Sequence, residues 1–204
     1  SNKNPDRYLK RALKIVKTGF GQPAIFNTES IITQLLRQGK SLEDARNGGC
    51  SGCVETGAFG KESYILTGYF NMPKVLELTL QNGIDPNTGK RIGPASGEAP
   101  SFDSFDDFFE AYKKQLNYFI DLKIEGNKLI QNLYAKYLPS PFLSLLIDDC
   151  IENATDYNAG GARYDSSYIQ GVGLGTMADS MSSIKFNCFE KQKFSLEELI
   201  KTLE

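Results

Sequence analysis

The sequence predicts a helix-rich fold of mixed α/β type with only a small sheet. Apolar residues recur at three- and four-residue spacing over several stretches, which is typical of amphipathic helices. Strand signals are few and short, so any sheet is small or is completed by residues outside this chain. Apolar residues make up 40% of the 204 positions. That share is enough to bury a core.

Two helices and a short strand are predicted at the start of the chain. Residues 7–17 carry apolar side chains at helical spacing, and two nearby glycines end that helix. The apolar run at residues 24–26 predicts a strand. Thr28 is a suitable cap for the next helix, which Gly39 closes. Residues 41–46 are expected to add one further helical turn.

The middle of the chain combines glycine-rich loops with helices. Five of the fourteen positions in residues 47–60 are glycine, so regular helix is not expected there. Asn71 is placed to cap a helix. Residues 84–101 are rich in proline and glycine and predict a loop. The long amphipathic stretch over residues 103–137 predicts a helix that ends before Pro139.

Three more helices and one loop are predicted in the last third of the chain. Residues 141–152 have a helical pattern, and residues 156–175 form a second glycine-rich loop. Helices are expected again over residues 176–186 and 195–203. The last of these opens with a serine and a glutamate spaced as a capping box.

The composition excludes several classes of function. The chain contains no histidine, so Ser-His and Cys-His nucleophilic pairs and histidine metal sites are absent from it. Its 23 basic and 25 acidic residues give a net charge of -2 and are mixed along the chain. Neither nucleic acid nor a membrane is therefore an expected partner. Four cysteines and a polar start to the sequence favour the cytoplasm.

Residues 50–57, called the cysteine loop below, are the strongest candidate for a catalytic or redox site in the sequence. Cys50 and Cys53 have the spacing of a redox pair or of half a zinc site, although the two other cysteines lack paired spacing. In extended backbone, Cys53 and Glu55 share a face with Cα atoms about 6.6 Å apart. A small molecule could then bridge thiol and carboxylate. The alternative is a buried cysteine beside a surface glutamate.

Several motifs resemble the glycyl radical enzymes, and the similarity extends over essentially the whole chain. They are Gly-Cys-Val-Glu at 52–55, Tyr-Ile-Leu-Thr-Gly-Tyr-Phe-Asn at 64–71, Tyr-Asn-Ala-Gly-Gly-Ala-Arg-Tyr at 157–164 and Tyr-Ile-Gln-Gly-Val-Gly at 168–173. The chain is most similar to the branch that dehydrates trans-4-hydroxy-L-proline. The pyruvate formate-lyase branch is less similar, because it has two adjacent cysteines where this chain has Cys53 and Val54.

The resemblance implies a fold and a domain organisation. The chain would be a helix-rich segment of an α/β barrel of ten strands in two half-barrels, with the cysteine loop at its centre. Residues 1–204 would be an internal segment of that barrel domain. The C-terminal glycyl radical domain is expected to lie outside the chain, because no Arg-Val-x-Gly-Tyr motif occurs in it. The segment alone is expected to be inactive, and the complete enzyme is expected to be a homodimer.

The resemblance also implies an activity. A thiyl radical on Cys53 would abstract hydrogen from a small hydroxylated substrate, Glu55 would transfer a proton, and Tyr69 would contact the substrate ring. The expected reaction converts trans-4-hydroxy-L-proline to pyrroline-5-carboxylate with loss of water. No cofactor or metal is expected within the segment itself. The radical would be stored on a glycine elsewhere in the enzyme, where a radical SAM activating enzyme installs it.

Three other interpretations remain open from the sequence. The first is a glycyl radical lyase or dehydratase for a diol, glycerol or choline. The second is a noncatalytic helical scaffold in which the glycine-rich loops are surface turns. The third is a dithiol protein that uses Cys50 and Cys53 as a reversible disulfide.

Overall fold

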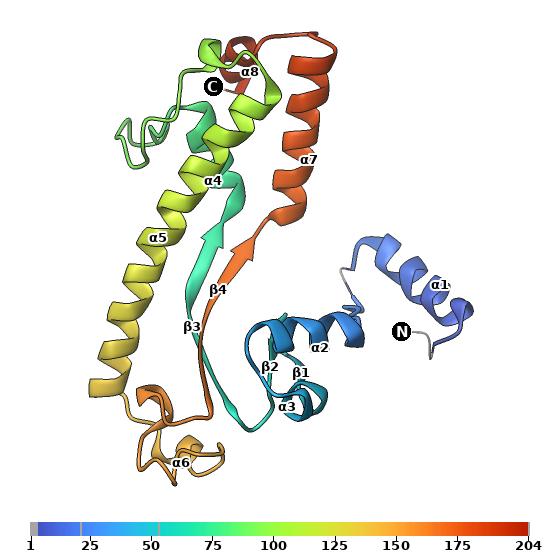
Figure 1. The fold of residues 1–204 in the computed structure, drawn as a ribbon. Coiled ribbons are helices and arrows are strands. Elements are labelled where there is room, and N and C mark those ends of the chain that lie inside the picture. Colours follow the sequence, from blue (N-terminus) through green and yellow to red (C-terminus); the bar gives the residue numbers. More distant parts are fainter. Residues whose placement is uncertain (1–3, 21, 53, 204) are drawn as a thin grey trace. The chain divides into compact units, whose positions relative to one another are not determined.

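The computed structural model describes residues 4–20, 22–52 and 54–203. The chain divides into two compact units (Figure 1). The first unit consists of Ser1–Ile65 and Leu133–Ser167, and the second of Leu66–Asn132 and Tyr168–Glu204.

The first unit contains helices of ten residues or fewer, and polar side chains cap two of its α-helices, α2 and α3. Its helices are α1 (Asp6–Ile15), the π-helical turn Val16–Phe20, α2 (Thr28–Arg37), α3 (Leu42–Asn47), α6 (Pro141–Ser144) and a 3₁₀ turn at Tyr157–Ala159. The side chain of Asn27 accepts a hydrogen bond from the amide of Ser30, so the cap of α2 is Asn27 rather than Thr28. Ser41 caps α3 in the same way, because its hydroxyl accepts from the Asp44 amide.

The strand predicted at residues 24–26 is wrong. These residues have no regular secondary structure, and Ile25 and Phe26 are largely exposed. An apolar run becomes a strand only when another strand pairs with it, and the sequence pattern does not report such a partner.

Two short strands in the first unit form the cysteine-loop hairpin. β1 (Gly49–Ser51) pairs antiparallel with β2 (Glu55–Gly57), and in this register Ser51 lies opposite Glu55. The hairpin contacts α2, whose Leu35 is fully buried. The glycines that argue against helix in this segment are therefore accommodated in a hairpin.

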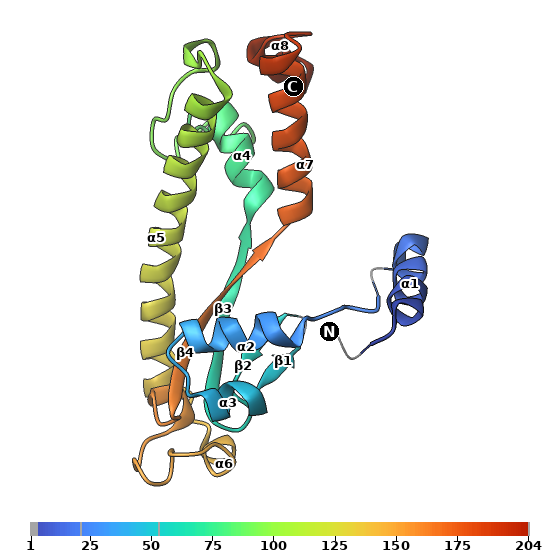
Figure 2. The same cartoon turned by 45° about the vertical axis from the view of Figure 1, so that its right-hand side comes forward.

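Two longer strands make a second small sheet. β3 (Glu62–Asn71) pairs with β4 (Tyr164–Val172), and Figures 1 and 2 show both arrows pointing the same way. The loop predicted over residues 156–175 is therefore wrong at Tyr164–Val172. β4 is rich in serine and polar side chains, and long-range bonds hold it: the Ser63 hydroxyl donates to Asp165 at 2.7 Å and accepts from the Ser166 amide at 3.2 Å.

The helix predicted over residues 141–152 ends at Ser144, and turns follow it. The carboxylate of Asp156 explains the early end. It accepts hydrogen bonds from the Ser140 amide at 2.9 Å, the Ser144 hydroxyl at 2.8 Å and the Asn158 amide at 2.9 Å. These bonds close the segment back on itself, so the helix cannot continue.

The second unit is built mainly from helices around an apolar core, and one of them, α5, is 33 residues long. Its helices are α4 (Met72–Leu80), a 3₁₀ turn at Ala99–Ser101, α5 (Phe105–Tyr137, which extends into the first unit), α7 (Leu174–Ile184), the π-helical turn Lys185–Glu190 and α8 (Leu196–Leu203). The predicted caps are confirmed at α4, where Asn71 accepts from the Lys74 amide, and at α8, where Ser195 and Glu198 bond reciprocally.

The core of this unit is formed by side chains from four helices. Its buried members are Val75, Leu76, Phe108, Tyr112, Met181, Ile184 and Leu196. The predicted loop at residues 84–101 is folded against this unit, because the buried side chain of Asn82 accepts from the amides of Ser96 and Gly97 and donates to Glu98. None of the helices in the described residues combines the length and apolar character of a membrane span.

Candidate active site

The tip of the cysteine-loop hairpin places Glu55 at the first position of β2. Val54 belongs to the turn and is 56% exposed. The extended backbone expected over residues 53–55 is therefore wrong at Val54, and the alternation argument for a shared face does not apply. Cys53 itself lies outside the described residues.

The carboxylate of Glu55 folds back over this turn. Its Oε2 atom accepts a hydrogen bond from the Val54 amide at 3.0 Å. The same atom lies 2.5 Å from the place where a Cβ on Gly52 would stand, and Gly52 has a φ of 56°. Only glycine suits position 52, because a side chain there would need both a left-handed backbone and the space of the carboxylate. Glu55 is thus held beside the two residues that flank position 53.

The end of β2 lies against a half-buried tyrosine, Tyr64. A Cβ on Gly57 would overlap the hydroxyl of Tyr64, so β2 and β3 approach each other closely here. Burial, together with the charge of Glu62, raises the pKa of Tyr64 to about 12. The hairpin therefore lies on a neutral phenol at neutral pH.

A buried carboxylate on α3, Asp44, is bonded to polar side chains from other segments of the first unit. Buried Asp44 accepts hydrogen bonds from the Lys61 ammonium at 2.5 Å and from the Tyr164 hydroxyl at 2.7 Å. These two bonds hold the pKa of Asp44 well below its ordinary value, and the pKa of Lys61 is raised mainly by the same bond. Local sequence patterns do not reveal this cluster, because its members are separated by up to 120 residues.

Tyr69 lies in the second unit, near the end of β3, and its side chain is 68% exposed. The ammonium of Lys123, on α5, donates a hydrogen bond to the carbonyl of Thr67 at 3.0 Å. This bond ties β3 to α5 two residues before Tyr69. Glu55 and Tyr69 therefore belong to different units, and each is fixed within its own unit.

The cysteines other than Cys53 lie in different surroundings. Cys50 faces Thr56 across the hairpin and is half-buried. Cys150 is buried against Tyr157 and Ala162, and burial raises the pKa of its thiol. Cys188 packs against the core of the second unit. In the described part of the chain, no group of three or more cysteine, aspartate or glutamate side chains is arranged to hold a metal ion.

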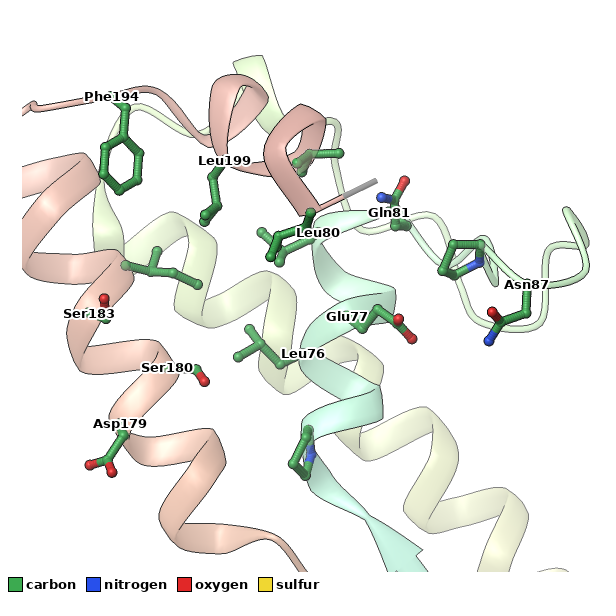
Figure 3. Close-up of a pocket in the computed structure, with 15 residues that line it drawn as sticks. Leu76, Glu77, Leu80, Gln81, Asn87, Asp179, Ser180, Ser183, Phe194 and Leu199 are labelled. Atoms are coloured by element: carbon green, nitrogen blue, oxygen red, sulfur yellow. The ribbon is translucent and has the colours of Figure 1, made fainter.

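The second unit also contains a groove with a volume of about 890 Å³. Leu76 and Leu80 of α4 and Leu199 of α8 line it, together with polar side chains of α7 (Figure 3). None of the predicted site residues lines this groove. Its walls offer mostly apolar contact, so the chemistry of the candidate site belongs to the hairpin and not to this groove.

Comparison with known proteins identifies the class of protein. The model of the pyruvate formate lyase-like family matches residues 1–204, and the chain belongs to this family. The resemblance inferred from the cysteine loop and the tyrosine and glycine motifs is thereby confirmed.

Proteins named as dehydratases are among those that the chain resembles. The chain is 56% identical over 204 residues to trans-4-hydroxy-L-proline dehydratase of Clostridioides difficile, covering 100% of this chain and 26% of the relative. The crystal structure of hydroxyproline dehydratase from Clostridioides difficile with trans-4-hydroxy-L-proline bound matches with a TM-score of 0.87 and 56% identity, over 98% of this chain and 26% of that one. The B12-independent glycerol dehydratase from Clostridium butyricum matches with a TM-score of 0.84 and 39% identity, over 99% of this chain and 26% of that one.

These matches settle the fold at a coarse level. The mixed helix and sheet fold predicted from the sequence is confirmed, and it matches solved structures of glycyl radical enzymes. The chain spans about a quarter of the length of the relatives it matches.

Proposed function

We propose that this chain is part of a glycyl radical dehydratase that converts trans-4-hydroxy-L-proline to pyrroline-5-carboxylate and water. The observation that carries the proposal is the Glu55 carboxylate, which is folded over the turn that contains position 53 and bonded to the Val54 amide. The 56% identity to trans-4-hydroxy-L-proline dehydratase supports the choice of substrate.

The proposal includes the arrangement of the complete protein. Residues 1–204 would be an internal segment of a ten-stranded barrel of two half-barrels, with the cysteine loop at its centre. The radical-storing glycine would lie in a C-terminal domain outside this chain, and the complete enzyme would be a cytoplasmic homodimer. A radical SAM activating enzyme would install the glycyl radical. Parallel β3 and β4, each followed by a helix, are consistent with a barrel segment.

Cys53 would perform the hydrogen transfer. The glycyl radical supplies the thiyl radical when the complete enzyme is active. The Cys53 sulfur then takes a hydrogen atom from a substrate carbon, leaving a thiol and a carbon radical. After water has left, the thiol returns the hydrogen atom and the sulfur radical is restored. The hydrogen atom that the sulfur takes is later returned, so the reaction has no net oxidation or reduction. A dehydration requires this balance, because loss of water needs no oxidant or reductant.

Glu55 would move the proton that the elimination needs. The neighbouring hydroxyl group leaves as water only if it gains a proton, and the remaining substrate radical gives one up. A carboxylate at the edge of the hairpin can carry out both transfers, so the reaction consumes no net proton. Tyr69 would pack its ring on the substrate, because aromatic faces contact apolar ring atoms well.

The test uses the complete protein that contains this chain, activated without oxygen. The wild type should release pyrroline-5-carboxylate from trans-4-hydroxy-L-proline. The Cys53→Ser variant should lose turnover and still show the glycyl radical signal in electron paramagnetic resonance, because only the hydrogen-transfer atom is removed. Retained turnover in Cys53→Ser, or turnover of glycerol in place of hydroxyproline, contradicts the proposal.

A matched control is available three residues away in the chain. Cys50→Ser should keep wild-type turnover, because Cys50 faces Thr56 in the strand pair and has no role in hydrogen transfer. Loss of activity in both variants, with a Cys50–Cys53 disulfide found by thiol titration, would favour the dithiol interpretation.

A further inference from the structure

A buried ion pair lies directly behind the cysteine-loop hairpin. The ammonium of Lys40 is 3.0 Å from Oε1 of Glu62, and the two side chains are only 3% and 0% exposed. Both residues belong to the first unit. Taking two charges out of water is costly, and an apolar pair of similar size is often equally stable. The stability of the fold alone does not explain charges at these positions.

The carboxylate of Glu62 joins three separate segments of the unit. Its Oε2 atom accepts a hydrogen bond from the Ala58 amide at 2.7 Å, and its Oε1 atom accepts one from the Ser166 hydroxyl. Lys40, which follows α2, supplies the positive charge. The carboxylate therefore connects the end of α2, the exit of β2 and strand β4 through charge-assisted bonds, which are shorter and stronger than neutral ones.

Lys40 is itself held in place by two further contacts. Its ammonium donates to the side-chain carbonyl of Gln38 at 3.1 Å and lies 5.3 Å from the centre of the Tyr164 ring. The cation is thus enclosed by an amide, an aromatic face and a carboxylate. Its position relative to Glu62 is well defined, and so is the direction of the Glu62 carboxylate.

The segment that Glu62 binds, at the end of β2, is close in the chain to the proposed reacting groups. Ala58 follows directly after β2, three residues beyond Glu55. A Cβ on Gly57 would come within 2.6 Å of Oε2 of Glu62, so the last residue of β2 rests on the same carboxylate. A hairpin of two three-residue strands is marginal by itself. Its placement in the unit must come from such contacts.

We propose that Lys40 and Glu62 are positioning residues for the hairpin that carries Cys53 and Glu55. The inference rests on the proposed function, because it assigns the pair to the alignment of those two groups with the substrate. The ion pair fixes where β2 leaves the hairpin, and the position of the Glu55 carboxylate at the start of β2 follows from that. A displacement of about 1 Å at reacting groups can cost about 100-fold in rate.

The test compares three forms of the complete activated enzyme. Glu62→Gln removes the negative charge and leaves the Lys40 ammonium without its counter-ion. Turnover per glycyl radical should fall by at least about tenfold, with KM changed by less than about twofold. The double variant Lys40→Met/Glu62→Gln removes both charges and keeps an acceptor for the Ala58 amide. It should recover turnover per radical to within about threefold of the wild type.

Expressing turnover per radical separates positioning from folding. A merely structural role would reduce the amount of folded, radical-bearing enzyme and leave turnover per radical unchanged. A matched control is the exposed pair of Lys201 and Glu197, which has the same 3.0 Å separation. Lys201→Met/Glu197→Gln should leave turnover per radical at the wild-type value. If Glu62→Gln does not accumulate, Lys40→Met replaces it in the comparison with the double variant.

A second readout does not depend on the substrate. Amide hydrogen exchange of the peptide over residues 49–58 should be faster in Glu62→Gln than in the wild type, and slow again in the double variant. If the wild type does not turn over hydroxyproline, the proposed function fails, and exchange alone then decides whether the pair fixes the hairpin. Unchanged exchange and unchanged turnover per radical in Glu62→Gln would overturn the inference.

Discussion

The two units of this chain are stabilised by different kinds of interior. In the first unit, fully buried side chains include Glu62 and Ser63, and Asp44 and Lys40 are nearly as buried. In the second unit, the core is aromatic and aliphatic: Phe108 is fully buried and lies edge-to-face with Phe102 at 5.4 Å. Buried charges are therefore concentrated in the unit that carries Glu55. The unit that carries Tyr69 combines a larger aromatic and aliphatic core with buried side chains that are mostly uncharged, such as Gln115 and Thr79.

This difference corresponds to what each unit is proposed to do. Apolar packing is nondirectional and tolerates small adjustments of shape. Hydrogen bonds to charged groups are directional and fix individual atoms. A thiol and a carboxylate that transfer hydrogen and protons need atomic placement, whereas an aromatic ring that contacts substrate needs only a rigid support. The carboxylate of Glu55, which accepts a hydrogen bond from the Val54 amide, has this directional kind of support.

Among the substitutions that test this difference between the units, the largest loss of turnover is expected at Glu55. Glu55→Gln keeps the size and the acceptor for the Val54 amide and removes the proton-transfer group. Turnover of the complete enzyme should fall by about 10² to 10⁴, the usual contribution of general acid–base catalysis. Glu43→Gln, at an exposed glutamate of α3, is the control and should leave turnover unchanged. Equal turnover in the two variants would remove Glu55 from the mechanism.

A smaller effect, on the free energy of unfolding, is expected when one glycine in each unit is replaced by alanine. Gly57→Ala introduces a Cβ that overlaps the Tyr64 hydroxyl and crowds Glu62, and should lower the free energy of unfolding by about 1–3 kcal/mol. Gly126→Ala, in helix α5, meets nothing within 4 Å and should raise it by about 0.5–1 kcal/mol. Denaturant unfolding of the complete protein measures both. An unchanged free energy of unfolding in Gly57→Ala would show that the hairpin is not packed closely against Tyr64 and Glu62.

The smallest effect is expected when low pH protonates Asp44 and weakens the hydrogen bonds that support α3. The folded-state pKa of Asp44 lies below its ordinary value of 3.8, so the stability that its bonds contribute is complete well above pH 3.8 and is lost as pH falls through 3.8 toward the folded-state pKa. Hydrogen exchange of the peptide over residues 41–47 should show wild type more protected than Asp44→Asn at pH 6, with the difference in protection narrowing as pH falls below about 4. A gap that widens in acid would mean that the ionised carboxylate does not stabilise α3.

The sequence predicted those elements whose signals are local. The helices that begin at Asn71 and Ser195 have caps a few residues from their first turn, and the long helix over residues 105–137 has a continuous apolar stripe. β4 was missed because its polar residues become a strand only by pairing with β3, about a hundred residues earlier. Local patterns carry no information about such a partner.

The site was predictable in part for the same reason. The glycine-rich segment marked the cysteine loop, and the carboxylate of Glu55 does lie over that turn, although through a bond to Val54 rather than through strand alternation. The support from Lys40 and Glu62 left no signal in the sequence. The two residues are 22 positions apart, and a buried charged pair looks like two surface residues until the fold brings them together.

The central claim is that the Cys53 thiol and the Glu55 carboxylate act together on one enclosed substrate. A crystal structure of the complete enzyme with trans-4-hydroxy-L-proline bound tests it most directly. The account predicts the Cys53 sulfur and a Glu55 carboxylate oxygen each within about 3–4 Å of the substrate, on the same side of the hairpin. A structure in which the two groups point to opposite sides of the hairpin, or in which the substrate binds away from it, would contradict the account.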